Sequence, residues 1–477
     1  MGNQIEDQVL RFGGGAAATT ITPATLAVVV LAIILFFLLP RRYIIVPLLF
    51  VSIFIPYAQV VVLGGLHFMA SRIMLPFAWV RVLSDRASNK FRFGAIDKVI
   101  VLWALADAVG AMLLWQNWGA VVNRLGFLYD VFGIYFLLRF LIGDYEDVKR
   151  TIRVLAVICG VVAVFMIREQ LTGLNVFSIF GGVPEVALVR DGQLRAQAMF
   201  AHPILAGTVG ATLLPLFVGL WWQGSRWKTT AVLGSLAATA MVLTSGSATP
   251  LLSLVAGIAA LCMWPLRRQL RWLRWSVVTA LIGLHLVMKA PVWALIGRIN
   301  VVGGSSGWHR YELIDEAIRH FGDWWLFGTK NPGSFGYYMG DLSNAYVVVA
   351  YSGGLLALLC FIGIFVQSFR KLGIARRAAR NNRRLEVMIW AFGATLFSTS
   401  MAYIGIWYFD QSVLTWYALL AMICAVTSVS ISGSRSTGMK RGPLLVGHED
   451  FQSSKEHAAQ GRSVFSPQQT SVLPEFD

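Results

Sequence analysis

Side chains that bind anions or move protons are concentrated in two stretches of an otherwise apolar chain, residues 168–202 and 289–344. The candidates for a shared site are Arg190, Arg195, His202, Arg298, Arg310, Asp341 and Asn344. An arginine guanidinium makes two charge-assisted hydrogen bonds to a phosphate at once, and an imidazole or carboxylate removes a proton from a hydroxyl. These residue types predict a site in which arginines bind a lipid-linked diphosphate and His202 or Asp341 acts as a general base.

Each candidate also has a structural interpretation. An arginine near a membrane surface extends its charge to lipid headgroups or caps a helix end. His202 precedes Pro203 at a predicted helix start, where its side chain would satisfy free backbone N–H groups. Asp341 would cap the following helix, and Asn344 would occupy a turn. The sequence leaves open which of these interpretations holds.

Membrane-spanning helices are the elements expected to position these residues. Hydrophobic residues make up 57% of the 477 residues and charged residues only 13%, against about a quarter charged in soluble proteins. The apolar residues form runs of about 17 to 22, the length that an α-helix needs to cross a bilayer. We therefore expect an all-α polytopic membrane protein with about 11 to 13 spanning helices.

The apolar runs divide the chain into segments. The expected spans are 22–40, 43–63, 68–80, 99–115, 120–142, 152–166, 203–222, 230–244, 248–265, 275–287, 345–369, 387–407 and 413–429. Residues 1–21 precede this transmembrane domain of 22–431, and the polar residues 432–477 are predicted to form a disordered cytoplasmic tail. The four cysteines lie in apolar runs without C-x-x-C spacing, so we expect neither disulfides nor a zinc site.

Basic residues predict the orientation of the chain. About 23 Lys and Arg fall in loops that would share one side, near Arg41, Arg81, Lys149, Arg226, Arg267 and Arg370. The more basic side of a membrane protein faces the cytoplasm. The two candidate stretches, 168–202 and 289–344, then become long extracytoplasmic loops. The net charge of +16 is spread over short clusters at helix ends, which argues against a nucleic-acid partner.

Within the second loop, residues 308–320 show the periodicity of an amphipathic helix. Tyr311, Ile314 and Ile318 are expected on its apolar face, and Asp315 on its solvated face. We expect this helix to lie at the membrane surface, above the bundle.

Three charged residues fall within one predicted span: Arg124, Asp130 and Arg139. A charge within the membrane is costly and is therefore usually paired or functional. We favour structural ion pairs within the bundle over a catalytic role for these residues.

Two sequence patterns resemble the O-antigen ligase and polymerase superfamily. The stretch R-A-Q-A-M-F-A-H-P-I-L-A-G, residues 195–207, resembles the pattern R-x-x-G-x-F-x-H-P-x-x-x-G that precedes a membrane helix in that family. The stretch S-S-G-W-H-R-Y-E-L-I-D-E-A, residues 305–317, followed by W-W-L-F-G and by L-S-N-A-Y, resembles the family's second loop. The resemblance covers residues 135–358 and includes the order and the sidedness of the motifs.

The resemblance implies a multi-helix membrane glycosyltransferase acting at the extracytoplasmic face of the bacterial inner membrane. Neither loop has the D-x-D or H-x-x-H spacing of a metal site, so we expect a metal-independent mechanism and no cofactor. The implied substrates are an undecaprenyl-diphosphate-linked oligosaccharide and a glycan or lipid acceptor. Arg195 and Arg310 match the arginines that bind the diphosphate, and Asn344 matches the Asn of the family's H-N pair. Ser343 stands where ligases of the family carry His, and Ala198 stands where the pattern has Gly.

The missing His at position 343 favours a polymerase of exopolysaccharide or O-antigen repeat units over a ligase of O-antigen or O-glycosylation. Two alternatives from other classes are a flippase or transporter of lipid-linked sugar and a non-catalytic scaffold of a polysaccharide export complex. A transporter would carry ionisable residues along a path through several helices, whereas here most of them lie in the two loops. Membrane lipids and export machinery are the further partners implied.

Overall fold

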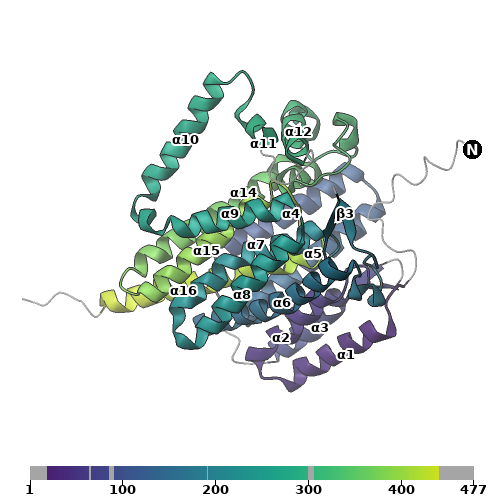
Figure 1. Ribbon diagram of the computed structural model, residues 1–477, viewed down its shortest axis with the longest axis vertical. Helices are drawn as coiled ribbons and strands as arrows, with labels where there is room; N and C mark the ends of the chain where they lie inside the picture. The colour runs from purple at the N-terminus through teal and green to yellow at the C-terminus, as the bar shows by residue number, and fades with distance from the viewer. Residues whose placement is uncertain (1–18, 64–65, 85–90, 191, 299–305, 440–477) are drawn as a thin grey trace, which may run out of the picture. The chain divides into compact units, whose positions relative to one another are not determined.

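The computed structural model of the chain describes residues 19–63, 66–84, 91–190, 192–298 and 306–439, most of them in helices (Figure 1). The α-helices are α1 (Pro23–Leu38), α2 (Ile45–Phe54), α3 (Ala70–Leu83), α4 (Ala95–Trp115), α5 (Trp118–Leu141), α6 (Tyr145–Thr172), α7 (Pro203–Leu220), α8 (Ser225–Thr244), α9 (Ala248–Cys262), α10 (Leu270–Val287), α11 (Leu295–Arg298), α12 (Ser306–Arg319), α13 (Phe321–Trp324), α14 (Ala345–Ala378), α15 (Arg383–Ala402) and α16 (Ser412–Met439). The strands β1 (Val60–Leu63) and β2 (Leu66–Met69) form one antiparallel pair, and β3 (Leu188–Arg190) and β4 (Gln193–Arg195) form another.

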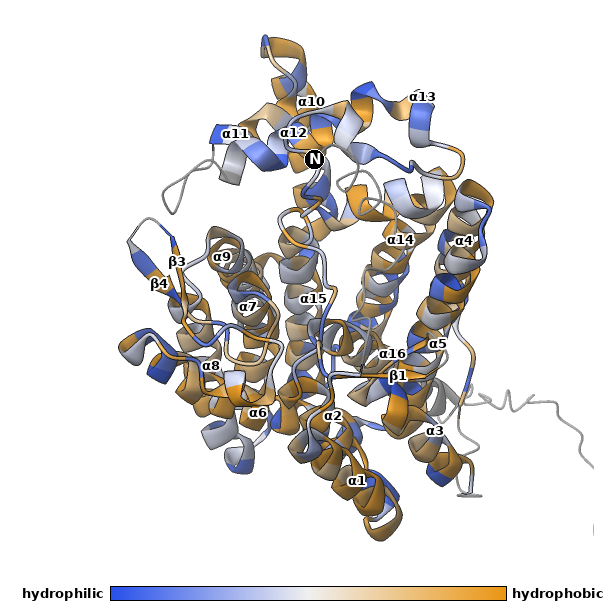
Figure 2. Cartoon of the chain, turned by 90° about the vertical axis from the view of Figure 1, so that its right-hand side faces the viewer, coloured by the Kyte–Doolittle hydropathy of each residue, from blue (hydrophilic) through white to orange (hydrophobic). Residues whose placement is uncertain are grey.

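Seven of the described helices are long and apolar enough to cross a membrane: α4, α5, α6, α7, α10, α14 and α15. Three further apolar helices, α1, α9 and residues 412–428 of α16, are shorter. Hydrophobic residues predominate along these helices (Figure 2). The chain thus has the helical, multi-pass architecture that its composition predicts. Helix α10 buries no residue within the chain and lies apart from the other long helices in Figure 1.

One predicted span is wrong. Residues 43–63 were expected to form a single helix, but α2 ends at Phe54 and strand β1 begins at Val60. The helix ends here because Pro56 follows Ile55, and the residue before a proline is disfavoured in helical geometry. Ile55 has the extended backbone angles φ −83° and ψ 122°. The run of valines from Val60 then pairs with β2, because β-branched side chains favour strands. The predicted tail lies outside the described residues from position 440 onward.

The basic loops meet at one end of the helix bundle. Arg41 Nη2 donates to the carbonyl oxygen of Phe140 (2.7 Å), joining the segment before α2 to the end of α5. Gln223 Nε2 donates to the carbonyl oxygen of Arg384 (2.9 Å), joining the α7–α8 connection to the start of α15. The other end of the bundle carries the two candidate stretches. The sequence prediction that the two candidate stretches are extracytoplasmic loops stays a prediction.

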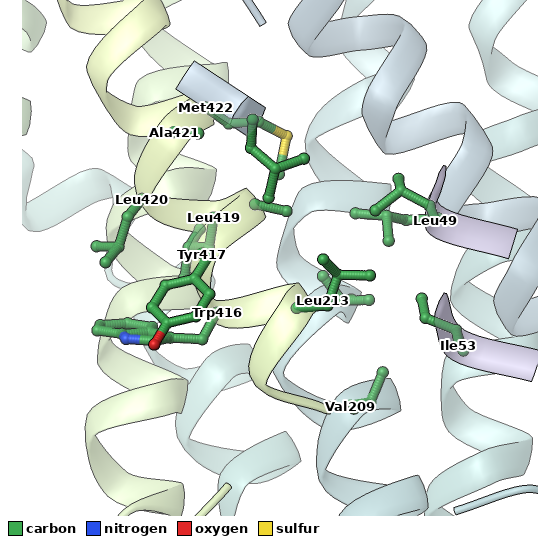
Figure 3. Close-up of a cluster of buried hydrophobic side chains, with 14 of the residues drawn as sticks. Leu49, Ile53, Val209, Leu213, Trp416, Tyr417, Leu419, Leu420, Ala421 and Met422 are labelled. Carbon is green, nitrogen blue, oxygen red and sulfur yellow. The ribbon is translucent and has the colours of Figure 1, made fainter. Parts of the chain in front are cut away.

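Close helix packing defines the interior of the bundle. Figure 3 shows side chains of α2, α7 and α16 meeting in one buried cluster that includes Leu49, Leu213 and Tyr417. Glycines let neighbouring helices approach as they do in membrane bundles. A β-carbon on Gly110 of α4 would lie 2.8 Å from the carbonyl oxygen of Gly353 in α14.

The three charges of the single span are paired across helices. The pairs are Arg124 Nη1 with Asp107 Oδ2 (2.7 Å), Arg72 Nε with Asp130 Oδ1 (2.7 Å) and Arg139 Nε with Asp97 Oδ1 (3.0 Å). Each pair joins α5 to α3 or α4. The interpretation of these residues as structural ion pairs is therefore confirmed.

Helix α14 is interrupted near its start, and the loop before it fills the interruption. Gly354 has φ 76°, which breaks the helical hydrogen bonds at this point. The released groups bind the segment after α13: Leu355 N donates to Trp325 O (2.7 Å), and Thr329 N donates to Tyr351 O (2.9 Å). A non-helical backbone inside a membrane protein needs such replacement partners. The second candidate stretch is thereby fixed against the bundle.

Candidate functional site

A cavity of about 340 Å³ lies where the two candidate stretches meet. Its lining comes from β3, the starts of α7 and α9, helix α12, the segment before α14 and the α15–α16 connection: Arg190, Ile204, Thr249, His309, Arg310, Tyr337, Tyr338, Asp341, Ser343 and Gly405. Three of the predicted residues, Arg190, Arg310 and Asp341, thus line one cavity. His202 is close enough for Arg190 and Asp341 to influence its protonation. Residues of both stretches therefore share one site, which we call the arginine cavity.

Arg310 enters the arginine cavity from helix α12. Its side chain is only 7% exposed, and Nη2 donates to the Thr249 hydroxyl at 2.7 Å. Gly405 leaves room for it, since a β-carbon there would lie 2.8 Å from Arg310 Nε. Among the described residues no carboxylate lies within ion-pair distance of this guanidinium, and burial lowers its pKa from the ordinary arginine value. A buried cation with this environment is suited to an anionic ligand.

Arg195 does not line the arginine cavity. It ends strand β4, is 6% exposed, and binds the α8–α9 turn through the carbonyl oxygen of Ser245 (3.3 Å) and the hydroxyl of Ser247. Ser247 directly precedes α9, and Thr249, which binds Arg310, is in the first turn of that helix. The two arginines matched by the family pattern therefore converge on the start of one helix.

His202 caps helix α7. Its Nδ1 accepts a hydrogen bond from Ile204 N at 3.2 Å, so the neutral ring carries its proton on Nε2. Burial and the neighbouring charge of Arg195 lower the pKa of His202 from 6.5 to about 4, and the carboxylate of Asp341 opposes this shift. The lone pair needed by a general base is engaged by the helix. The structural interpretation of His202 is confirmed, and its predicted catalytic role is not tested by this geometry.

Asn344 is the cap of helix α14. Its Oδ1 accepts from Tyr346 N (2.9 Å) and Val347 N (3.2 Å), and the residue is 1% exposed. The suggestion that Asp341 caps this helix is therefore wrong, because Asn344 occupies that position. Asp341 is instead exposed and lines the arginine cavity. Ser343, which replaces the family His, lines the same cavity.

The two remaining predicted arginines differ in position. Arg190 is exposed at the end of β3 and lines the arginine cavity. Arg298 is exposed at the end of α11 and is not among the residues that line the cavity. Only Arg190 of these two is therefore placed to contact a ligand bound there.

His309 lines the arginine cavity, although the sequence analysis did not select it as a site residue. Its Nε2 lies 3.1 Å from the carbonyl oxygen of Asp341 and 3.3 Å from that of Tyr338. A carbonyl oxygen only accepts, so Nε2 must carry the proton, and the neutral ring keeps a lone pair on Nδ1. His202 is the same tautomer, but there Nδ1 is engaged by Ile204 N. The one signal in the sequence was the position of His309 directly before Arg310.

The helix predicted at 308–320 is present as α12, but its buried face differs from the prediction. Leu313 is fully buried, whereas Ile318 is half-exposed. Asp315, expected to face water, is 6% exposed and accepts from Trp293 Nε1 at 3.0 Å and from Arg319 Nε at 2.7 Å. Helix α12 packs against α13 and α14. This contact buries the face of α12 that also carries Arg310.

Ala198 adopts an unusual backbone conformation with φ 50°. This left-handed region favours glycine, the residue that the family pattern has at this position. Glu169 holds the segment, since its Oε2 accepts from Ala198 N at 2.7 Å.

The sequence matches no protein-family model and no curated protein. The resemblance to the O-antigen ligase and polymerase superfamily therefore stays a prediction that rests on the motifs in residues 195–207 and 305–358.

Proposed function

We propose that this chain is a glycosyltransferase of the bacterial cytoplasmic membrane with its site on the extracytoplasmic face. It transfers a glycan from an undecaprenyl-diphosphate-linked donor to an acceptor hydroxyl. The product is a longer exopolysaccharide or O-antigen chain, and Ser343 in place of the family His favours this polymerase reaction over ligation to another acceptor. Ala198, with a backbone conformation suited to the glycine of the family pattern, agrees with the resemblance behind this proposal.

The buried guanidinium of Arg310 is the observation that carries the proposal. Removing a cation from water costs several kcal/mol unless an opposite charge compensates it. Thr249 supplies a hydrogen bond but no charge. A donor diphosphate in the arginine cavity would supply that charge and would also face Arg190. The start of α9, which binds both Arg195 and Arg310, adds the positive end of a helix dipole.

His309 is the residue that we assign as general base. The acceptor hydroxyl oxygen attacks the anomeric carbon of the donor sugar, and its proton passes to His309 Nδ1. The bond between the anomeric carbon and the diphosphate oxygen breaks, and the leaving undecaprenyl diphosphate takes the electron pair. Arg310 and Arg190 stabilise the negative charge that develops on it. A single displacement of this kind inverts the configuration of the anomeric carbon.

The test uses purified protein in lipid nanodiscs with undecaprenyl-diphosphate-linked repeat units, with product length read by gel electrophoresis. Arg310→Ala should lower the rate of elongation at least about 100-fold, the usual effect of removing one donor to a developing anion. His309→Gln, whose amide can still donate to the Asp341 carbonyl, should lower it by a similar factor because it lacks a basic nitrogen.

Arg319→Ala is the matched control, because Arg319 belongs to the same helix but is exposed, lies outside the arginine cavity and, among the described residues, pairs with Asp315. It should elongate at the wild-type rate. Normal polymer length and yield with Arg310→Ala would refute the proposed function. Movement of the lipid-linked substrate across the bilayer without any elongation would identify a transporter instead.

A further inference from the structure

The wall of the arginine cavity is divided between two kinds of side chain. Its two cations, Arg190 and Arg310, come from β3 and α12. The turn of residues 337–341, which precedes α14, instead contributes two aromatic rings and a carboxylate, those of Tyr337, Tyr338 and Asp341. The reaction derived above gives these three side chains no role.

The two tyrosine rings of this turn are open to solvent. Tyr337 is 91% exposed and Tyr338 is 36% exposed. Their ring centroids are 5.0 Å apart with an interplanar angle of 87°, so the two rings face different directions. Aromatic side chains stabilise proteins and complexes mainly through the apolar area that they bury. Tyr337 buries almost none of its area within the chain, so its ring is available to a ligand.

Tyr338 also lies against His309, the residue assigned above as general base. The two ring centroids are 5.6 Å apart, and His309 Nε2 lies 3.3 Å from the carbonyl oxygen of Tyr338. A hydroxyl that gives its proton to His309 must come within about 3 Å of Nδ1. The sugar ring that carries this hydroxyl therefore lies in the part of the cavity that the 337–341 turn lines.

Charge distinguishes this part of the cavity from the part that carries the arginines. The 337–341 turn contains no Lys or Arg. The Asp341 carboxylate repels a diphosphate but accepts hydrogen bonds from sugar hydroxyls, whereas the guanidinium of Arg310 favours the diphosphate. A cavity of about 150 Å³ holds one benzene molecule, so the arginine cavity, with about 340 Å³, has room for a sugar ring beside an anion.

We propose that Tyr337, Tyr338 and Asp341 bind the terminal sugar of the acceptor glycan. The apolar face of the sugar ring packs on the tyrosine rings, and its hydroxyls donate to the Asp341 carboxylate. A further hydroxyl then faces His309 Nδ1. The assignment of this sugar to the acceptor rests on the proposed function, whereas the binding of a glycan at the turn is measured without any transfer.

Binding is measured on the full chain in nanodiscs with two probes. The first is the oligosaccharide released by mild acid from the lipid-linked repeat units, free of lipid and phosphate, followed by saturation-transfer NMR. The second is inorganic diphosphate, followed by the broadening of its phosphorus NMR signal. Neither probe can be elongated, so binding and transfer are read separately.

The test variant is Tyr337→Leu with Tyr338→Leu, which removes both rings and keeps the backbone carbonyl beside His309. Tyr337→Phe with Tyr338→Phe keeps both rings. Because both side chains are exposed, neither pair of substitutions should alter folding, which thermal denaturation checks. The matched control is Tyr43→Leu with Tyr129→Leu, since these two tyrosines are each 40% exposed and lie outside the arginine cavity.

The oligosaccharide should bind to the wild type, and the leucine variant should weaken its binding at least about tenfold because two ring contacts are lost. The phenylalanine variant and the control should bind it as the wild type does. Absence of oligosaccharide binding by the wild type would overturn the proposal. Equal binding by the leucine variant would also overturn it and would assign the rings to the aromatic belt at the membrane surface.

Two further variants separate the two parts of the cavity. Asp341→Asn should weaken oligosaccharide binding, since a neutral amide oxygen accepts less strongly than a carboxylate, and should leave diphosphate binding at least as strong. Arg310→Ala should weaken diphosphate binding and leave oligosaccharide binding unchanged. The opposite pattern would overturn the proposal. Normal elongation by Arg310→Ala would refute the proposed function without affecting the glycan site, so the two failures are told apart.

Discussion

His202 and His309 have the same side chain but opposite hydrogen-bond arrangements. His202 accepts from a backbone N–H through Nδ1, whereas His309 donates to backbone carbonyls through Nε2. The first arrangement stabilises a helix end, and the second leaves a basic nitrogen at the arginine cavity. The sequence pattern H-P pointed to His202, but only the partner of each ring nitrogen distinguishes a cap from a base.

Replacement of His202 by Asn should change the pH dependence of stability. The pKa of His202 is about 4 in the folded chain and 6.5 for the free side chain, so between these values the unfolded chain binds more protons. Stability is therefore fully present above pH 6.5 and is lost as pH falls toward 4, by up to about 3 kcal/mol. Asn keeps the cap but does not titrate. The difference in denaturation midpoint between the two proteins in detergent should change across this pH range.

A constant difference between His202→Asn and the wild type from pH 7 to pH 4 would contradict the lowered pKa. The same variant in the elongation assay separates the two histidines further. The variant should retain most of the activity at pH 7, because in the wild type Nδ1 of His202 is engaged by Ile204 N and is not free to act as a base.

The residues of the site could be predicted by type but not by role. Arg190, Arg310 and Asp341 were expected to lie together, because both loops combine arginines with proton acceptors, and they line one cavity. The burial of Arg195 against the α8–α9 turn depends on Ser245 and Ser247, about 50 residues along the chain. No local pattern in the sequence carries that contact.

At the scale of elements, the interrupted helix α14 decides where the second stretch lies. The segment from Trp325 to Gly328 enters the interruption, and its backbone replaces the helical partners of Tyr351 and Leu355. The sequence showed two signals here, a glycine pair at 353–354 and the W-W-L-F-G stretch. Neither signal alone predicts that the two segments pair. The pairing depends on a positive φ at Gly328 in one segment and at Gly354 in the other.

Gly328→Ala should destabilise the chain strongly. Gly328 has φ 95°, and a β-carbon there would lie 2.1 Å from the carbonyl oxygen of Tyr351, so the segment must leave the interruption. Strain together with loss of the hydrogen bonds of Thr329 and Leu355 should cost about 3 kcal/mol or more. Thermal denaturation of the purified protein measures the effect.

Gly373→Ala is the control for this substitution. Gly373 belongs to helix α14, has regular geometry and has nothing within 4 Å of the added carbon. Alanine there should be neutral or stabilising by up to about 1 kcal/mol, since glycine weakens a helix interior. Equal denaturation midpoints for Gly328→Ala and Gly373→Ala would contradict the role assigned to the inserted segment.

At the scale of the whole chain, charge separates the two ends of the bundle. Basic loops gather at one end, and the two candidate stretches meet at the arginine cavity. Composition and the apolar runs were sufficient to predict a helical, multi-pass chain, because spanning length is a property of the sequence itself. The strands β1 and β2 were missed because an apolar run of that length also fits a spanning helix.

Which end faces outward is a prediction that cysteine labelling can test. In a variant with all four native cysteines replaced, Tyr337→Cys and Arg380→Cys add one exposed thiol at each end. A membrane-impermeant maleimide should label Tyr337→Cys in intact cells and Arg380→Cys only after the membrane is permeabilised. The reverse pattern would place the arginine cavity on the cytoplasmic side, where the basic loops were expected. An undecaprenyl-diphosphate-linked repeat unit displayed on the outer face would then not reach Arg310, so the proposed extracytoplasmic transfer would fail together with the orientation.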